Sequence, residues 1–180
     1  MAALQRLEQD SGHIWPDGYR SEFNPQLPGW MQSLADSLTQ AAVILIDYGY
    51  PRSEYYHEQR RDGTWICFHR HRASDSPLRY PGLQDITASV DFTAVAEVGV
   101  NAGLTLAGYT TQAWFLVNNG LEQLVAEAMG SDHKTRVRLS QQVKQLTLPS
   151  EMGDRFQVIA FTKGLDLPLR GFSRNDLSHK

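Results

Sequence analysis

The stretch Val43-Ile44-Leu45-Ile46-Asp47-Tyr48-Gly49-Tyr50-Pro51 decides the fold. Its four consecutive large aliphatic residues predict a strand that is buried on both faces, as is typical of parallel sheets in α/β proteins. The stretch then ends on a carboxylate, an aromatic ring, a glycine and a proline. Because ligands of open α/β sheets collect beyond the carboxyl ends of the strands, we expect a functional site at this end.

Length and composition set bounds on the class of protein. The 180 residues suit one domain with its own core, so we expect residues 1–180 to form a single domain. The net charge is −3 and the basic residues are scattered, which predicts neither a nucleic-acid partner nor a membrane partner. The lone Cys67 excludes an internal disulfide, and the amino terminus lacks the apolar core of a secretory signal. Both features predict a cytoplasmic protein.

The periodicity of apolar residues predicts alternating strands and helices. Helices are expected at 25–40, 92–102, 114–129 with an interruption at 118–120, and 134–146. Strands are expected at 43–46, 64–69, 86–90, 104–112 and 157–162. Asp91 is expected to cap the helix that follows it, and Gly103 is expected to end that helix. Residues 70–83 are interpreted as a loop, and residues 164–180 as a tail.

Two groups of residues are candidates for a binding site. At the end of the first strand, Asp47 could pair with a guanidinium, or it could cap its own turn, and Tyr48 could stack on a ligand or pack in the core. In an extended segment, Asp85, Thr87 and Asp91 would share one face. That second group could equally be the solvent side of a half-buried strand.

Metal, nucleophile and nucleotide motifs are weak or missing. His69 and His71 lie two residues apart, but no further ligand is near, so no metal site is expected; His71 is retained as a hydrogen-bonding candidate. Cys67 lies in an apolar run, where thiols are usually inert. The chain has no G-x-S-x-G motif, and no two of its glycines are separated by a single residue. An adenosyl or dinucleotide cofactor is therefore not expected to bind by the usual α/β route.

Three blocks occur in the order expected of a known family: Val43 to Pro51, Gly82 to Phe92, and Met152 to Phe156. With them, the chain resembles the MidA-like family of class I S-adenosylmethionine-dependent methyltransferases, which includes the mitochondrial arginine methyltransferase needed for respiratory complex I assembly. The resemblance implies an α/β fold: the carboxyl-terminal part of a Rossmann-like sheet, with helices packed on it and an antiparallel closing hairpin. Residues 1–24 would be a remnant or inserted segment.

The same resemblance implies S-adenosyl-L-methionine as cofactor and places the candidate residues on the acceptor side. Asp47, Tyr48 and Gly49 would border the acceptor pocket, with Asp85, Thr87 and Asp91 on its rim. For a guanidinium acceptor, Asp47 together with Glu22, Asp85 or Asp91 would supply paired carboxylates. The family's upstream glycine-rich loop, ribose-binding acid and E-F-F-D-A-type motif have no counterpart in this sequence, so no cofactor-binding residue is identified.

The expected partners follow from the resemblance to only the carboxyl-terminal part of the family's fold. The chain is expected to be inactive without an amino-terminal half, and its partners would be that half or a protein substrate. An exposed sheet edge could also make it a homo-oligomer. Two alternatives stay open. One is a non-enzymatic interaction or assembly module on a partial methyltransferase fold, and the other is an unrelated α/β enzyme that uses Asp47 and His71 as acid and base.

Overall fold

The computed structural model describes residues 15–128 and 132–179, and its fold is α/β as predicted. Its contacts divide the chain into two compact units. Unit 1 holds Met1–Pro25 and Gly49–Val95, and unit 2 holds Gln26–Tyr48 and Ala96–Lys180. Each unit is described by itself. The single-domain expectation stays a prediction.

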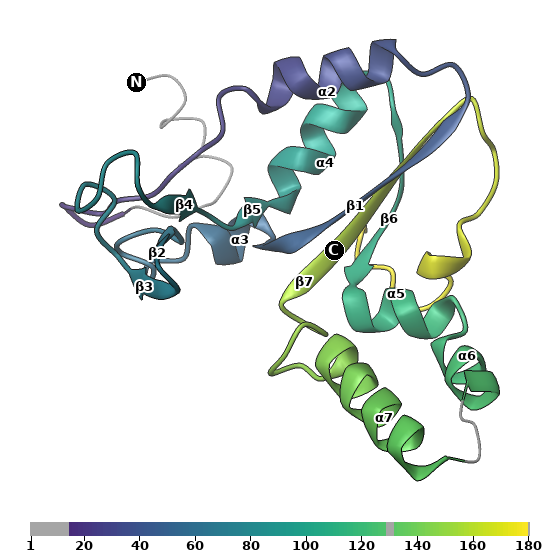
Figure 1. The fold of residues 1–180 in the computed structure, drawn as a ribbon. Coiled ribbons are helices and arrows are strands. Elements are labelled where there is room, and N and C mark those ends of the chain that lie inside the picture. The colour runs from purple at the N-terminus through teal and green to yellow at the C-terminus, as the bar shows by residue number, and fades with distance from the viewer. Residues whose placement is uncertain (1–14, 129–131, 180) are drawn as a thin grey trace. The chain divides into compact units, whose positions relative to one another are not determined.

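Unit 2 is built on three antiparallel strands. Strand β7 (Phe156–Lys163) lies between β1 (Ala41–Tyr50) and β6 (Thr105–Thr111), as Figure 1 shows. Phe161 and Ile159 on β7 are almost fully buried, so the middle strand supplies much of the core. The pair β6–β7 is the antiparallel closing hairpin that the sequence predicted. The helices of this unit are α2 (Leu27–Asp36), α5 (Gln112–Asn118), α6 (Leu121–Ala128) and α7 (His133–Thr147).

Strand β1 differs from its prediction in burial. Its residues 41–48 pair antiparallel with β7, and only Gly49 and Tyr50 pair with a parallel strand, β5 (Val90–Asp91). Within the described residues, 41–48 therefore have a strand partner on one side only. Ile44 and Ile46 are 46% and 49% exposed, so the expectation of burial on both faces was wrong for this chain. An aliphatic run indicates how much apolar surface a strand can bury. In this chain, the described residues cover less of that surface than the run could bury.

Helix boundaries follow their local signals closely. The Asp91 carboxylate accepts a hydrogen bond from the Ala94 amide at 3.0 Å, so it caps α4 (Phe92–Asn101) as predicted. Gly103 ends that helix with a φ of 85°. The predicted interruption of the next helix falls between α5 and α6, where Gly120 has a φ of 89°.

Unit 1 contains a small antiparallel sheet of order β3-β2-β4. Its strands are β2 (Ile66–His69), β3 (Arg72–Ser74) and β4 (Asp85–Thr87), and a one-turn helix, α3 (Arg52–Tyr55), follows β1. Two predictions need correction. The strand expected at 86–90 is two strands, because Ile86 pairs with Cys67 whereas Val90 pairs with Gly49. The expected loop 70–83 begins with the turn and strand β3 of a hairpin.

Residues 165–179, within the expected tail 164–180, pack against the rest of unit 2. Phe172, in the short 3₁₀ helix Arg170–Phe172, is buried with Val158 and Ala160. The side-chain amide of Asn118 donates to the carbonyls of Gly171 and Arg174, both at 2.9 Å. The last part of the chain therefore adds to the core of this unit.

Candidate functional site

The polar residues of unit 1 converge on Glu22. Its Oε1 atom accepts hydrogen bonds from the Tyr55 hydroxyl at 3.1 Å and from the Thr64 amide at 2.8 Å. The Thr64 hydroxyl donates to the same oxygen and itself accepts from the Ser89 amide at 2.9 Å. One carboxylate oxygen thus connects three segments that are distant in the sequence.

The second oxygen of Glu22 lies against a glycine. Oε2 is buried and accepts no hydrogen bond from a described residue. Any side chain at Gly63 would collide with it, and Gly63 has a φ of 79°. The positive φ therefore favours glycine at position 63, and a side chain there would displace the Glu22 carboxylate.

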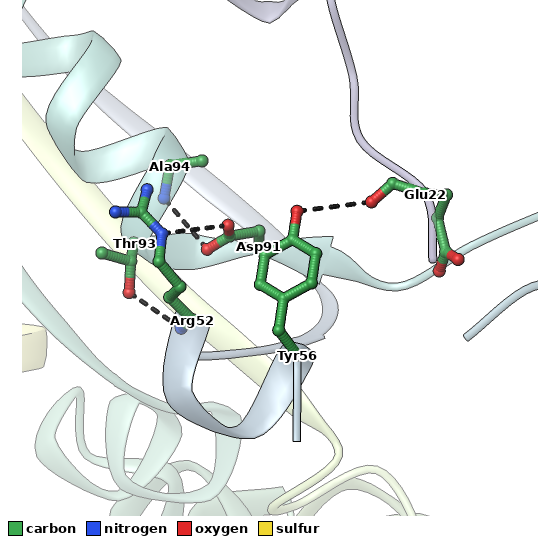
Figure 2. A network of polar contacts seen from close by, with 6 residues as sticks. All are labelled: Glu22, Arg52, Tyr56, Asp91, Thr93 and Ala94. Carbon is green, nitrogen blue, oxygen red and sulfur yellow. Dashed lines mark hydrogen bonds and ion pairs between the residues drawn. The ribbon is translucent and has the colours of Figure 1, made fainter. Parts of the chain in front are cut away.

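The network continues from Glu22 to the start of α4 (Figure 2). The Tyr56 hydroxyl donates to the Glu22 carbonyl at 3.3 Å. Arg52 forms an ion pair with Asp91, 3.6 Å from Nε to Oδ2, and both side chains are nearly buried. The Arg52 amide donates to the Thr93 hydroxyl at 3.0 Å. Asp91 thereby serves both as the cap of α4 and as the counter-ion of Arg52.

Aromatic rings enclose the same network. Trp15 stacks on Tyr19 with ring centroids 5.5 Å apart, and its indole N–H donates to the Tyr56 carbonyl at 2.8 Å. Tyr55 and Tyr56 meet edge to face at 4.8 Å. Tyr55 and Tyr56 are buried, so these rings fill the interior of unit 1 around the carboxylates.

This environment raises the pKa values of the tyrosines. Burial raises the pKa of Tyr56 to about 12; the Asp91 carboxylate adds to the rise and the Arg52 guanidinium opposes it. Burial likewise raises the pKa of Tyr55 well above its usual value, with the Glu22 carboxylate contributing. Both phenols are therefore neutral hydrogen-bond donors at physiological pH. They hold the network together as donors.

Asp47 and Tyr48 lie in unit 2, and both make local contacts. The Asp47 carboxylate is exposed and accepts a hydrogen bond from the Tyr48 amide at 2.8 Å. The Tyr48 ring meets Phe156 edge to face at 5.8 Å. One Asp47 oxygen is thus engaged by the backbone of its own strand, and Tyr48 packs on the neighbouring strand β7.

The other candidates lie in unit 1 in two places. Gly49 pairs with Val90 on β5, next to Asp91, and Glu22 joins this region through Tyr56. Asp85 and Thr87 lie instead on β4, because the chain changes partner at residues 88–89. The expected common face of Asp85, Thr87 and Asp91 is therefore divided between two strands. His71 is exposed in the β2–β3 turn with a φ of 62°.

Sequence reasoning missed the residues that hold Glu22 and Asp91 in place. These are Arg52, Tyr55, Tyr56 and Thr64. Tyr55 and Tyr56 follow directly after the strand end that was singled out, so their position was a usable signal. Thr64 carried none, because its partners Glu22 and Ser89 are 42 and 25 residues away along the chain.

The glycine turn by which α/β proteins usually bind an adenosyl cofactor has no counterpart in the sequence of this chain. Such a cofactor needs a glycine turn at a helix start that lets the ligand approach the backbone. At Gly49, Gly99 and Gly171, the space that a side chain would take is filled by the chain's own Val90, Phe161 and Phe115. At these three glycines, other parts of the chain lie close to the backbone, so the glycines allow internal packing.

Neither a metal centre nor a membrane span emerges from the described part of the chain. Within residues 15–128 and 132–179, no three His, Cys, Asp or Glu side chains gather closely enough to hold a metal ion. In the same ranges, no helix has the length and apolar character needed to cross a bilayer.

This chain is similar to curated proteins and to solved structures. The zebrafish (Danio rerio) protein named "Protein arginine methyltransferase NDUFAF7, mitochondrial" is 32% identical over 130 residues, which are 71% of this chain and 29% of that protein. The human (Homo sapiens) protein of the same name is 29% identical over 77% of this chain and 30% of its own length. A crystal structure of a "likely methyl transferase" from Burkholderia thailandensis, bound to S-adenosyl-homocysteine, is 42% identical with a TM-score of 0.91.

The extent of the matches is itself informative. The Burkholderia structure covers 99% of this chain, whereas this chain covers 46% of it, so the chain spans less than half the length of these relatives. The model of the family described as "Putative S-adenosyl-L-methionine-dependent methyltransferase" matches residues 2–110. The chain belongs to this family of S-adenosyl-L-methionine-dependent methyltransferases.

Proposed function

We propose that this chain is the acceptor-side portion of an S-adenosyl-L-methionine-dependent methyltransferase whose acceptor is arginine in a protein. One observation carries the first part: nearly the whole chain matches less than half of a methyltransferase-like protein that was crystallised with S-adenosyl-homocysteine. The curated relatives supply the second part, since they are named as protein arginine methyltransferases.

The glycines support the idea that this chain binds the acceptor and that another portion of such a protein binds the cofactor. The glycine turn that would hold the cofactor is missing from the sequence, and the glycines of the described sheets are packed internally. We therefore propose that methyl transfer requires an amino-terminal portion that binds the cofactor. This chain would contribute the surface that binds and orients the acceptor.

The open edge of β1 also supports the proposal that another portion joins this chain. Residues 41–48 pair with β7 on one side, and no described strand pairs with them on the other. Unpaired strand edges are ready templates for pairing with another segment. The half-exposed Ile44 and Ile46 would then be covered, which fits an aliphatic run typical of a fully buried strand.

The role expected of this portion is to position the acceptor for methyl transfer. Methyl transfer to nitrogen needs an acceptor that is held in line and whose charge is offset. The exposed Asp47 carboxylate has one oxygen engaged by the Tyr48 amide, and its other oxygen could accept from a guanidinium N–H. The Glu22–Tyr56–Asp91 network would keep the backbone of unit 1 rigid during this step.

A chimera tests the proposal. This chain would replace the matching segment of the Burkholderia thailandensis protein, and the chimera would be incubated with cell lysate and trideuteromethyl-labelled S-adenosylmethionine. We expect labelled methylarginine in protein hydrolysates with the chimera and none with this chain alone. In the chimera, Asp47→Asn should lower the labelling rate by about 100-fold, because misplacing a reacting group costs that order.

The possible outcomes separate the two parts of the proposal. Transfer by the isolated chain would overturn the need for a cofactor-binding portion. Label on a group other than arginine would overturn the acceptor assignment. A folded chimera that binds S-adenosyl-homocysteine but transfers nothing would favour a non-enzymatic interaction module.

A further inference from the structure

One face of the small sheet of unit 1 carries an exposed aromatic ring beside a carboxylate, and we call it the hairpin face. Directly opposite residues of an antiparallel pair point to the same side, and alternate residues of a strand point to opposite sides. Phe68 lies opposite Ala73 and Asp85, and Ile66 lies opposite Thr87. The hairpin face therefore consists of Ile66, Phe68, Ala73, Asp85 and Thr87.

This face is exposed although its centre is apolar. Ile66 is 44% exposed and Phe68 is 42% exposed. On the opposite face, Cys67 is fully buried, the His69 ring stacks on Tyr80 at 4.5 Å, and its Nδ1 lies 2.8 Å from the Leu83 carbonyl oxygen. The loop that follows β3 thus contacts the opposite side of the sheet at His69. Ile86, which pairs with Cys67, is 57% exposed on that face. Figure 1 shows the three strands β2, β3 and β4 of this sheet.

The charge on the hairpin face is a single carboxylate. Asp85 is exposed, and no described residue forms a side-chain hydrogen bond or ion pair with it. Arg72 lies opposite His69 and so belongs to the opposite face, while Arg70 and His71 occupy the turn. The hairpin face therefore presents an aromatic ring beside an unpaired negative charge.

We propose that the hairpin face binds the substrate protein through a segment that carries an arginine beside an apolar residue. Charge complementarity favours this occupant, because a guanidinium can stack on Phe68 and pair with Asp85 at the same time. Directly opposite residues have Cβ atoms about 5 Å apart, a spacing that one guanidinium spans. The apolar neighbour of that arginine would cover Ile66. This inference rests on the proposed function and names where its acceptor protein docks.

The test is an NMR titration of the isotopically labelled full chain that needs no cofactor. The probe is the capped peptide Gly-Leu-Arg-Leu-Gly, and the comparison peptide has citrulline, which is neutral, in place of arginine. We expect saturable shifts at the amides of Ile66, Phe68 and Asp85 with the arginine peptide. The citrulline peptide should bind about fivefold more weakly, the loss typical of one exposed charge and one cation–π contact.

Matched variants identify the residues that cause the preference for the arginine peptide. Asp85→Asn should reduce the preference for the arginine peptide to the part that the Phe68 ring supplies, whereas Asp75→Asn, an exposed aspartate of the loop, should leave the preference intact. Phe68→Ser should weaken the arginine peptide by about fivefold or more.

Each other outcome overturns the inference. Shifts that avoid the hairpin face would exclude it as the docking surface. Equal binding of both peptides by the unmodified chain would exclude arginine as the recognised group. Concentration-dependent shifts at these amides without peptide would identify a second copy of the chain as the occupant. Because no methyl transfer is measured, failure of the proposed activity and failure of this docking surface are distinguishable.

Discussion

At the scale of single residues, Gly49 decides how two strands meet. It follows the aliphatic run of β1 and pairs with Val90. A Cβ at this position would clash with the Val90 carbonyl and would lie 2.7 Å from the Phe92 ring. The glycine is therefore required by the close approach of the chain to itself, and not by a positive φ.

Gly49→Ala should lower the free energy of unfolding by about 3 kcal/mol, the upper part of the range for overpacked interiors. Urea unfolding followed by circular dichroism measures the change. Gly29→Ala is the matched control, because nothing lies near its Cβ position and helix α2 should gain about 1 kcal/mol from alanine. Equal stability of the two variants would contradict the packing at Gly49.

The Tyr56 phenol makes stability depend on alkaline pH. Its folded-state pKa is about 12 against about 10 for an unfolded chain, so the fold favours the neutral phenol. The stability it contributes is fully present below pH ~10 and is lost as pH rises towards 12.

Tyr56→Phe should therefore flatten the fall in the free energy of unfolding between pH 10 and pH 11.5. Tyr80→Phe, at an exposed ring, should leave that slope unchanged. Urea unfolding at successive pH values gives the slope, and absorbance at 295 nm follows phenolate formation. An unaltered slope for Tyr56→Phe would remove the proposed link between the network and alkaline stability.

At the scale of elements, the sequence predicted the features that neighbouring residues control, such as the ends of a helix. Asp91 and Gly103 bound α4 correctly because a cap and a left-handed glycine act within one turn of helix. Alternation across residues 86–90 predicted one strand, but alternation cannot say which partner each residue has. The change of partner from Cys67 to Gly49 divides that segment into β4 and β5.

The carboxyl-terminal segment is held by a carboxylate that the sequence did not single out. The amides of Tyr109 and Ser178 each donate to Asp176 Oδ1 at 3.0 Å. Partial burial alone would raise the pKa of Asp176, but these hydrogen bonds outweigh it and hold the pKa below its usual value. The stability from Asp176 is therefore present above pH ~4 and is lost as the pH falls below it.

Asp176→Asn should remove part of the acid sensitivity of the chain. The free energy of unfolding at pH 7 should fall by about 1 kcal/mol, because the hydrogen bonds lose their charged acceptor. Between pH 5 and pH 3 it should then decline less steeply than in the unmodified chain. Asp166→Asn, at an exposed position of the same segment, serves as control. Parallel curves for Asp176→Asn and the unmodified chain would contradict this assignment.

The open edge of β1 predicts self-association when nothing covers it. Ile46→Lys should raise the monomer fraction in sedimentation velocity, since a charge on an edge strand opposes pairing. Val137→Lys changes a comparably exposed apolar residue on α7 and should leave the distribution as it was. A chain that remains monomeric at millimolar concentration would argue against an open edge.

At the scale of the whole molecule, the fold and family could be predicted from short blocks of sequence, whereas most of the site could not. Glu22 and Asp91 were selected as acids of an acceptor pocket, and the structure places both in a network within unit 1. The donors that hold Glu22 come from residues 33 and 42 positions away, and no local pattern encodes such contacts.

The central claim is that this chain carries the acceptor side of a methyltransferase but not its cofactor site. Calorimetric titration of S-adenosyl-homocysteine into the purified chain tests it most directly, with the Burkholderia thailandensis protein as the positive control. We predict saturable heat for the control and none for this chain at ligand concentrations up to about 1 mM, which corresponds to a binding free energy weaker than about −4 kcal/mol. Saturable binding by this chain with a micromolar Kd would contradict the account.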